Sequence, residues 1–154
     1  MKTPKNKAVR LAIIGTGGMA NVHAERFTKI RGCKVIAACD VDLARAKTFA
    51  EKYGIPECFS SVEALLAGAD IDAVTIVTPD AFHSPVSLVC LKAGKHVLCE
   101  KPLALNYGDA KKMVQAARKA GVVNMVNFSY RDWPCIQAVT KAIHRGDIGE
   151  VRHV

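Results

Sequence analysis

Short apolar runs rich in β-branched residues alternate along the chain with segments in which apolar residues recur every three or four positions. The short runs are typical of buried strands, and the periodic segments are typical of helices that bury one face. Strands are expected at residues 9–15, 34–40, 72–79, 96–100 and 122–128. Strands that are apolar along their length and separated by helices indicate a parallel sheet covered on both faces. The pattern therefore predicts an α/β fold with a doubly wound parallel sheet.

Residues that start and stop helices support this division. Glycine commonly ends a helix by taking a left-handed conformation, and glycines follow the helical segments at positions 32, 54, 94 and 121. Residues 60–63 (SSVE) have the pattern of a capping box that opens a short helix. Asp42 and Asn106 are suited to cap the helices that follow them.

The first expected strand runs into a glycine turn, residues 15–20 (GTGGMA), which fits G-x-G-x-x-G/A. Gly15 permits a tight turn, Gly17 lets the backbone approach a pyrophosphate, and Ala20 allows close packing of helix on strand. The N-terminal end of the following helix would point its amide groups at the phosphates. Such turns are common, but this one lies between a strand and a helix, which is the context that dinucleotide binding requires.

The second expected strand ends at Asp40, twenty positions after Ala20. A carboxylate there would accept hydrogen bonds from the ribose hydroxyls of an adenosine and would repel a 2′-phosphate. No basic residue follows until Arg45. NAD is therefore favoured over NADP. A helix cap is the alternative interpretation of Asp40, but Asp42 fills that role better.

Composition excludes several other classes of protein. The chain has 154 residues, of which 50% are hydrophobic and 23% charged, as in an ordinary globular domain. No apolar run approaches the ~20 residues that span a bilayer, and no signal peptide is recognisable, so we expect a cytoplasmic location. The net charge of +8 arises partly from the N-terminal segment and includes no basic cluster interleaved with aromatic residues. Nucleic acid is therefore not an expected partner.

The six cysteines form no C-x-x-C pair, and several lie within apolar segments. We interpret them as reduced thiols that pack as small apolar side chains. Their spacing does not match a zinc site, and no metal is expected.

Four further motifs give the chain a specific resemblance. They are TPDAFH (78–83), CEKPLA (99–104), NFSYR (127–131) and GDIGEV (146–151). With the glycine turn and Asp40, they resemble the N-terminal part of the Gfo/Idh/MocA family of oxidoreductases, over nearly the whole chain. The resemblance implies a Rossmann-like dinucleotide-binding domain with NAD as its cofactor.

The resemblance also implies roles for individual residues. Thr78 and Pro79 would line the cofactor, although Asp80 stands where the family often has Asn. His83 would lie beside the cofactor or, in the alternative, pack under the loop. Together with the glycine turn, the implied cofactor contacts are Gly15, Gly17, Gly18, Met19, Asp40, Thr78, Pro79, His83, Glu100 and Arg131.

The fourth expected strand ends in two opposite charges and a proline. The resemblance implies that Glu100 binds the nicotinamide ribose and that Lys101 is the catalytic residue, reaching the substrate hydroxyl or carbonyl. Pro102 would set the turn, with a cis Lys101–Pro102 bond as one way to do so. Because neighbouring residues of an extended segment point to opposite sides, a mutual Glu100–Lys101 ion pair is the weaker interpretation. His23 is interpreted as a helix-packing residue.

The C-terminal region does not resemble a finished domain. A helix is expected over 136–145, and residues 150–154 are expected to start a new strand. We therefore predict a dinucleotide-binding domain over 1–128, followed over 129–154 by a linking helix and the first strand of a truncated α+β domain. In this family the second domain carries a D-x-x-x-H pair, and no histidine here follows an aspartate by four positions.

Three functions remain open from the sequence. The first is an NAD-dependent oxidoreductase that transfers hydride between nicotinamide and a sugar, polyol or related hydroxy compound. The second is an NAD-requiring glycoside hydrolase of the same superfamily. The third is a nucleotide-binding module without turnover, which we expect for the truncated chain alone. The partner of the parent protein would be a small-molecule substrate, and homo-oligomerisation is left open.

Overall fold

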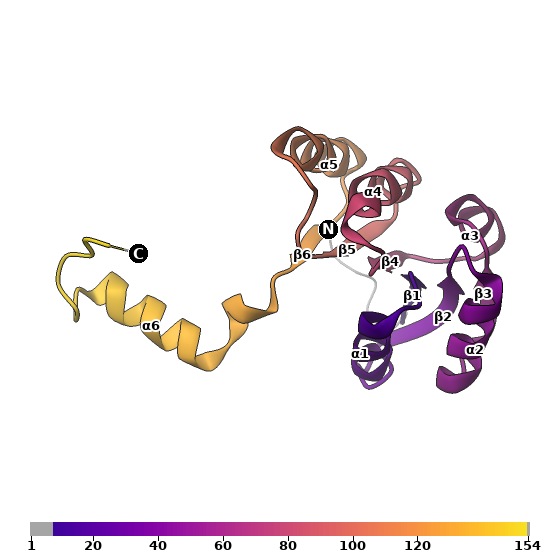
Figure 1. Cartoon of the computed structure of the whole chain (residues 1–154), viewed down its shortest axis with the longest axis horizontal. Helices are drawn as coiled ribbons and strands as arrows, with labels where there is room; N and C mark the ends of the chain where they lie inside the picture. Colours follow the sequence, from indigo (N-terminus) through magenta and orange to yellow (C-terminus); the bar gives the residue numbers. More distant parts are fainter. Residues whose placement is uncertain (1–7, 154) are drawn as a thin grey trace.

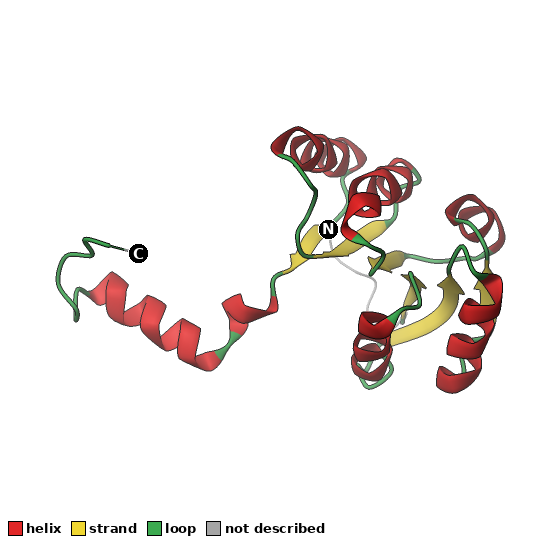
Figure 2. Ribbon diagram, viewed as in Figure 1, coloured by secondary structure: helices red, strands yellow, loops and turns green. Residues whose placement is uncertain are grey.

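The computed structural model describes residues 8–153 and contains a six-stranded, fully parallel sheet in the order β3-β2-β1-β4-β5-β6 (Figures 1 and 2). The strands are β1 (Val9–Ile14), β2 (Cys33–Cys39), β3 (Glu57–Phe59), β4 (Ala73–Ile76), β5 (His96–Glu100) and β6 (Asn124–Asn127). The predicted doubly wound α/β fold is confirmed. Only β3 was not predicted, because three residues are too few to form a recognisable pattern.

The predicted caps locate several of the helices, but Gly32 and Gly94 do not cap the helices that precede them, whose C-caps are Thr28 and Ala93. They are α1 (Gly18–Phe27), α2 (Leu43–Tyr53), α3 (Val62–Gly68), α4 (His83–Lys92), α5 (Tyr107–Ala120) and α6 (Pro134–Arg145), with 3₁₀ turns η1 (Asp80–Phe82) and η2 (Ser129–Asp132). The side chains of Asp42, Ser61 and Asn106 accept hydrogen bonds from the first-turn amides of α2, α3 and α5. Gly54 and Gly121 end α2 and α5 in the left-handed conformation.

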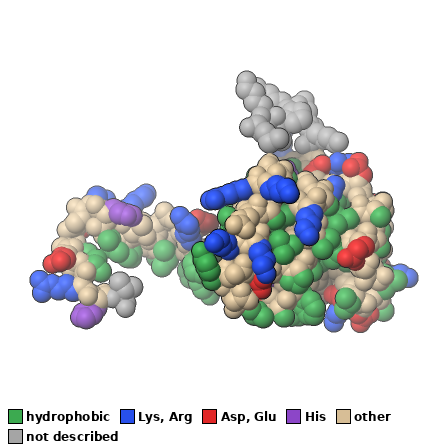
Figure 3. Space-filling model, turned by 90° about the horizontal axis from the view of Figure 1, so that it is seen from above, with side chains coloured by type: hydrophobic (Ala, Val, Ile, Leu, Met, Phe, Trp, Pro, Cys, Tyr) green, Lys and Arg blue, Asp and Glu red, His purple; other side chains and the backbone are tan. Residues whose placement is uncertain are grey.

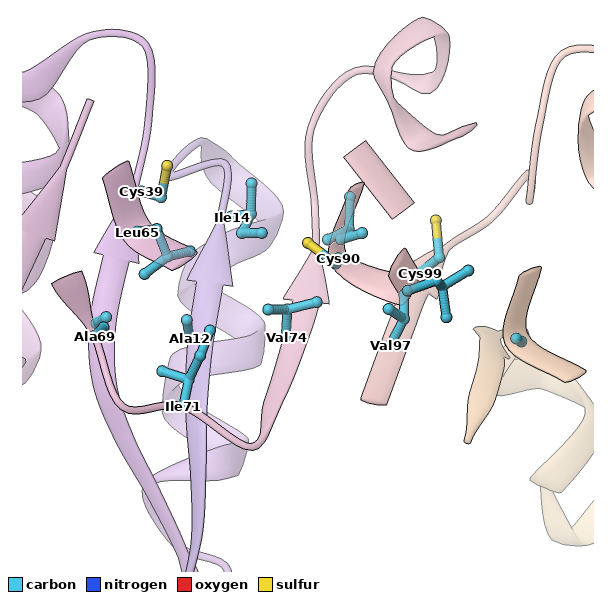
Figure 4. Packing of buried hydrophobic residues seen from close by; sticks show 14 of the residues in the cluster. Ala12, Ile14, Cys39, Leu65, Ala69, Ile71, Val74, Cys90, Val97 and Cys99 are labelled. Carbon is cyan, nitrogen blue, oxygen red and sulfur yellow. The ribbon is translucent and has the colours of Figure 1, made fainter. Parts of the chain in front are cut away.

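Side chains alternate across β1 and enter two cores. Ala12 and Ile14 join the larger cluster, with Leu65 of α3 and Cys90 of α4 (Figure 4). Ile13, between them, points into a smaller cluster that includes residues of α1 and α2. The sheet is therefore packed between α3, α4 and α5 on one face and α1 and α2 on the other (Figure 1).

Helices cover only part of the sheet face on which α1 and α2 lie. Leu98 of β5 and Met125 of β6 are paired in register on the face opposite α4 and α5. Met125 is 54% exposed, and α1 borders Leu98 across a groove instead of covering it. Among the described residues the expectation of helices on both faces thus holds for β1 and β2 but not for β5 and β6.

The C-terminal segment projects away from the sheet (Figures 1 and 2). Three apolar side chains of α6, Ile136, Val139 and Ile143, are exposed, and the projecting arm is visible apart from the main body in Figure 3. The strand predicted from residue 150 is not formed: residues 150–153 are irregular, since no strand of residues 8–153 lies beside them. The division of the chain at residue 128 stays a prediction. No helix within residues 8–153 is long and apolar enough to cross a membrane.

Candidate functional site

The turn after β1 depends on glycine. Gly15 has φ +90°, and a Cβ added there would lie 2.8 Å from backbone atoms of Val77 and Thr78. Any other residue would strain the backbone and clash with the segment that follows β4. Gly17 caps α1 without a side chain, and Gly17 and Gly18 are exposed with open space around them. The positive end of α1 is thus accessible to an anion.

Asp40 lies directly after β2 and is buried against this turn. Its Oδ2 accepts hydrogen bonds from the Thr16 N–H at 2.8 Å and the Thr16 hydroxyl at 2.9 Å, and its Oδ1 from the Asp42 N–H at 3.0 Å. Arg45 donates to both oxygens, at 3.2 and 2.6 Å. Burial by itself would raise the pKa of Asp40, but these hydrogen bonds outweigh burial and lower the pKa to about 2. Asp40 is therefore an anion at neutral pH.

A hollow of about 220 Å³ lies beyond the carboxyl ends of β1, β2 and β4, and we call it the β2-side hollow. Gly15, Asp40, Arg45, Thr78 and Pro79 are among the residues that line it. The buried hydroxyl of Thr78 has no hydrogen-bond partner among residues 8–153. A buried hydroxyl without a partner is costly in a protein and is a natural contact for a polar ligand.

The end of β5 is held by a buried polar cluster. Glu100 pairs in register with Asn127 of β6, and its Oε1 accepts hydrogen bonds from Asn127 Nδ2 at 2.5 Å and His23 Nε2 at 2.9 Å. Its Oε2 accepts from the Lys101 N–H at 3.1 Å, and His23 Nδ1 lies 2.8 Å from the Thr75 hydroxyl. We call Glu100, His23, Asn127 and Thr75 the Glu100 cluster.

Hydrogen bonding keeps Glu100 charged inside the protein. Burial by itself would raise the pKa of Glu100, but the hydrogen bonds from Asn127, His23 and the Lys101 N–H outweigh burial and lower it. The Glu100 carboxylate therefore ties α1, β5 and β6 together. Its remaining capacity to accept a hydrogen bond lies on Oε2.

A groove of about 360 Å³ runs between α1 and the end of the sheet at β5 and β6, and we call it the α1 groove. Met19, Leu98, Lys101 and Tyr130 are among its lining residues. Glu100 lines the groove as well, but it is buried, whereas Lys101, in the bend after β5, is exposed. Lys101 thus lines the groove as an exposed cation, and its contact with Glu100 within residues 8–153 is made by its backbone N–H.

His83 lies beneath the loops that follow β4 and β5. Its side chain is fully buried, with Nδ1 2.6 Å from the Pro102 carbonyl oxygen and Nε2 2.9 Å from the Thr78 carbonyl oxygen. The peptide bond between Lys101 and Pro102 is cis. His83 is therefore packed under the loop, as in the alternative interpretation of the sequence. Its imidazole has no exposed surface on which a cofactor could lie.

The structure brings together most of the predicted site residues, at two places. Gly15 lies in the β2-side hollow and Met19 in the α1 groove, so the glycine turn stands between the two. Arg131 is exposed on η2 and lines neither of them, whereas its neighbour Tyr130 lines the groove.

Three features were missed by the sequence analysis: the Arg45–Asp40 ion pair, the hydrogen bonds of His23, and Asn127. The signal for Asn127 is its position, because a polar residue at the end of a half-buried strand lies beside the end of the neighbouring strand.

The order of the strands reverses between β1 and β4, and the glycine turn lies at this point. In open α/β sheets ligands bind at such a switch point, beyond the carboxyl ends of the strands. With an exposed helix N-terminus and a buried carboxylate after β2, these features define a dinucleotide-binding domain of the Rossmann type.

Comparison with known proteins identifies the family. Residues 9–128 match the family model GFO_IDH_MocA, described as the oxidoreductase family with an NAD-binding Rossmann fold. The chain therefore belongs to the Gfo/Idh/MocA oxidoreductase family, and its cofactor is NAD, as the sequence predicted.

Individual relatives agree with this assignment. The chain is 35% identical over 144 residues to D-glucoside 3-dehydrogenase of Escherichia coli K12, covering 93% of this chain and 41% of the relative. It resembles two solved structures: the WlbA dehydrogenase of Bordetella pertussis in complex with NADH and UDP-GlcNAcA (TM-score 0.89, 29% identity, 93% of this chain, 44% of that one), and scyllo-inositol dehydrogenase of Lactobacillus casei with NAD(H) and scyllo-inositol (TM-score 0.87, 30% identity, 94% and 43%). The chain thus spans less than half the length of these relatives.

Proposed function

We propose that this chain is the cofactor-binding part of an NAD-dependent oxidoreductase that acts on a ring hydroxyl of a sugar, polyol or related compound. The observation that carries the proposal is the placement of Lys101, a cation exposed in the α1 groove at the carboxyl end of β5, beside the glycine turn. Relatives named for a D-glucoside and for scyllo-inositol support a substrate of this class.

The residues present fit NAD. The exposed amides at Gly17 and Gly18 would hold the pyrophosphate, and Asp40 would accept hydrogen bonds from the hydroxyls of the adenosine ribose. The Thr78 hydroxyl, which has no partner among residues 8–153, would form a hydrogen bond with the cofactor. NAD supplies the hydride acceptor when it is bound.

Lys101 has a role that its charge and position support. An ammonium group within hydrogen-bond distance of the substrate oxygen would stabilise the negative charge that develops there and would take part in moving its proton. Glu100 acts through the backbone: anchored by its buried hydrogen bonds, it fixes the end of β5 and thereby the direction in which Lys101 projects.

We also propose that the 154-residue chain binds NAD but does not turn over. The family's D-x-x-x-H pair is not found in its sequence. Isothermal titration with NAD tests the first part, and NADH formation from a panel of inositols and aldoses tests the second. Failure of the folded chain to bind NAD would refute the cofactor site, and sustained NADH formation would refute the inactivity.

The role of Lys101 is tested in the natural gene product that carries this sequence. We expect Lys101→Met to lower kcat by about a hundredfold or more, as removal of a group that acts on the reacting atoms does, while NAD affinity changes less than twofold. Lys111→Met, at an exposed site on α5, is the matched control. A Lys101→Met enzyme with unchanged kcat would refute the assignment.

A further inference from the structure

Most of the large apolar side chains that are exposed within residues 8–153 lie in two stretches, 19–30 and 123–151. The first stretch forms one wall of the α1 groove, and the second includes α6 on the projecting arm (Figure 3). Apolar side chains gathered in this way mark a contact surface, whereas ones scattered singly do not. One chain therefore carries two apolar surfaces that the rest of residues 8–153 leaves open.

The α1 groove has the length of a helix. Its lining on the α1 side runs from Met19 through Val22 to Ile30, a distance of about 16 Å at the rise of an α-helix. Leu98 of β5 lines the opposite wall, and Met125 of β6 is paired with Leu98 on the same face of the sheet. In α/β folds helices cover both faces of the sheet, so the natural occupant of a groove at this place is a helix.

Helix α6 carries an apolar stripe of matching length. Ile136, Val139 and Ile143 are spaced by three and four positions, so they lie on one side of α6, and they are 43%, 56% and 40% exposed. The helix has 12 residues and is about 18 Å long. By the same periodicity Lys141 and Arg145 lie on the other side, so the stripe carries no charge.

A bend at η2 directs α6 away from its own groove. The Arg131 N–H donates to the Phe128 carbonyl at 3.1 Å, and Gln137 Nε2 donates to the Arg131 carbonyl at 2.6 Å. The rings of Tyr130 and Trp133 pack edge to face, with centroids 4.6 Å apart. These contacts set the direction in which α6 leaves the sheet (Figures 1 and 2), so the stripe reaches its own groove only if they break. A second copy of the chain presents the same groove and needs no such change.

We propose that two copies of the 154-residue chain associate by exchanging α6, with the stripe of each copy docked in the α1 groove of the other, along Val22 to Ile30. Each copy offers one stripe and one groove, so the contact closes around a two-fold axis. Because the contact is made twice, the buried area is double that of one docked helix, which favours a stable dimer.

The docked stretch lies away from the end of the groove at which Lys101 is placed. The Val9 N–H at the start of β1 donates to the Gly32 carbonyl at 2.8 Å, so the chain beyond α1 lies at the amino ends of the strands. Lys101 follows the carboxyl end of β5. The inference therefore does not rest on the proposed function.

Sedimentation equilibrium of the chain from about 1 to 300 µM tests the proposal, since a dimer dissociates on dilution. We expect a reversible equilibrium between monomer and dimer. Val139→Asp places a charge in both contacts and should weaken the dimer about a hundredfold or more. Ala138→Asp adds the same charge to an exposed position on the other side of α6, and should change the dissociation constant less than about threefold.

A variant of the groove tests which surface receives α6. Val22→Lys should also give a monomer, because it places a charge in the groove. A mixture of the Val139→Asp and Val22→Lys chains should form a heterodimer, because one wild-type stripe then meets one wild-type groove, and the other contact joins opposite charges. Thermal unfolding followed by circular dichroism shows whether each variant is folded, and Ile30→Lys, which is 50% exposed before substitution, is the second groove variant.

Three results would overturn the inference. A wild-type chain that stays monomeric over the whole concentration range would show that the two surfaces do not associate. A dimer that folded Val22→Lys and Ile30→Lys chains keep would show that α6 docks elsewhere, for example on α6 of the second copy. Larger oligomers in place of a dimer would exclude a closed exchange between two copies.

Discussion

The most informative single substitution in the Glu100 cluster is Glu100→Gln. Both carboxylate oxygens of Glu100 face donors: Oε1 faces His23 and Asn127, and Oε2 faces the Lys101 N–H. A glutamine amide has one oxygen and one NH₂ group. In either orientation of the amide, an NH₂ group therefore meets a donor that had been satisfied.

The magnitude follows from these contacts. Glu100→Gln loses at least one charge-assisted hydrogen bond and leaves a buried donor unpaired, which costs about 2 kcal/mol of unfolding free energy. For a chain of this size that corresponds to a fall in Tm of about 6 °C. The loss should extend to the presentation of Lys101, because the Lys101 N–H is one of the groups released.

The pH dependence gives a second, independent readout. The pKa of Glu100 is lowered from 4.5 in the folded protein, so its carboxylate stabilises the fold above that value, and the stabilisation is lost as the pH falls through the folded pKa. The difference in unfolding free energy between wild type and Glu100→Gln should be complete at neutral pH and should shrink as the pH falls below 4.5.

Urea unfolding followed by circular dichroism at several pH values measures this difference. Glu51→Gln, at an exposed site on α2, is the control and should change stability by less than ~0.5 kcal/mol at every pH. If Glu100→Gln were as stable as the wild type at neutral pH, the assignment of Glu100 as the anchor of β5 would be wrong.

Three further predictions test the surroundings of the site. Gly15→Ala should cost about 3 kcal/mol or more in urea unfolding, since its Cβ would meet backbone atoms 2.8 Å away at a φ of +90°; an unchanged midpoint would contradict this turn geometry. His83→Phe keeps a ring of similar size but leaves the Pro102 carbonyl without its partner, so we expect a loss of about 2 kcal/mol in thermal unfolding. Asn127→Asp places a second carboxylate against Glu100 and should destabilise the fold by about 3 kcal/mol at neutral pH and by less in acid, whereas equal losses at both pH values would exclude charge repulsion as the cause.

The elements that carry a local signal could be predicted from the sequence. Strand β1, the glycine turn and Asp40 are each recognisable within a few residues, and the caps at Asp42 and Asn106 locate two helices. The strand expected from residue 150 was wrong for a physical reason. Strand propensity alone does not form a strand, because its backbone groups need a neighbour, and none of residues 8–153 provides one there.

Contacts between distant residues could not be predicted in the same way. His23 and Glu100 are separated by 77 positions, and the helical pattern showed only that His23 faces inward. Arg45 was noted for its distance along the chain from Asp40, but its reach across the first turn of α2 depends on how the cap at Asp42 orients that turn. A polar residue on a buried face indicates that a partner exists, and only the fold shows which one.

The end of β5 illustrates how one short segment can serve two surfaces. Glu100, the last residue of β5, is buried, and Lys101, in the bend that follows, is exposed at the α1 groove. The inward carboxylate is held by side chains from α1 and β6, while the carbonyl of Pro102 is held by His83 from α4. The backbone of Lys101 is thereby held on both sides, while its side chain is exposed. The role proposed for Lys101 would benefit from this arrangement, since a backbone held on both sides sets the position from which the side chain reaches a substrate oxygen.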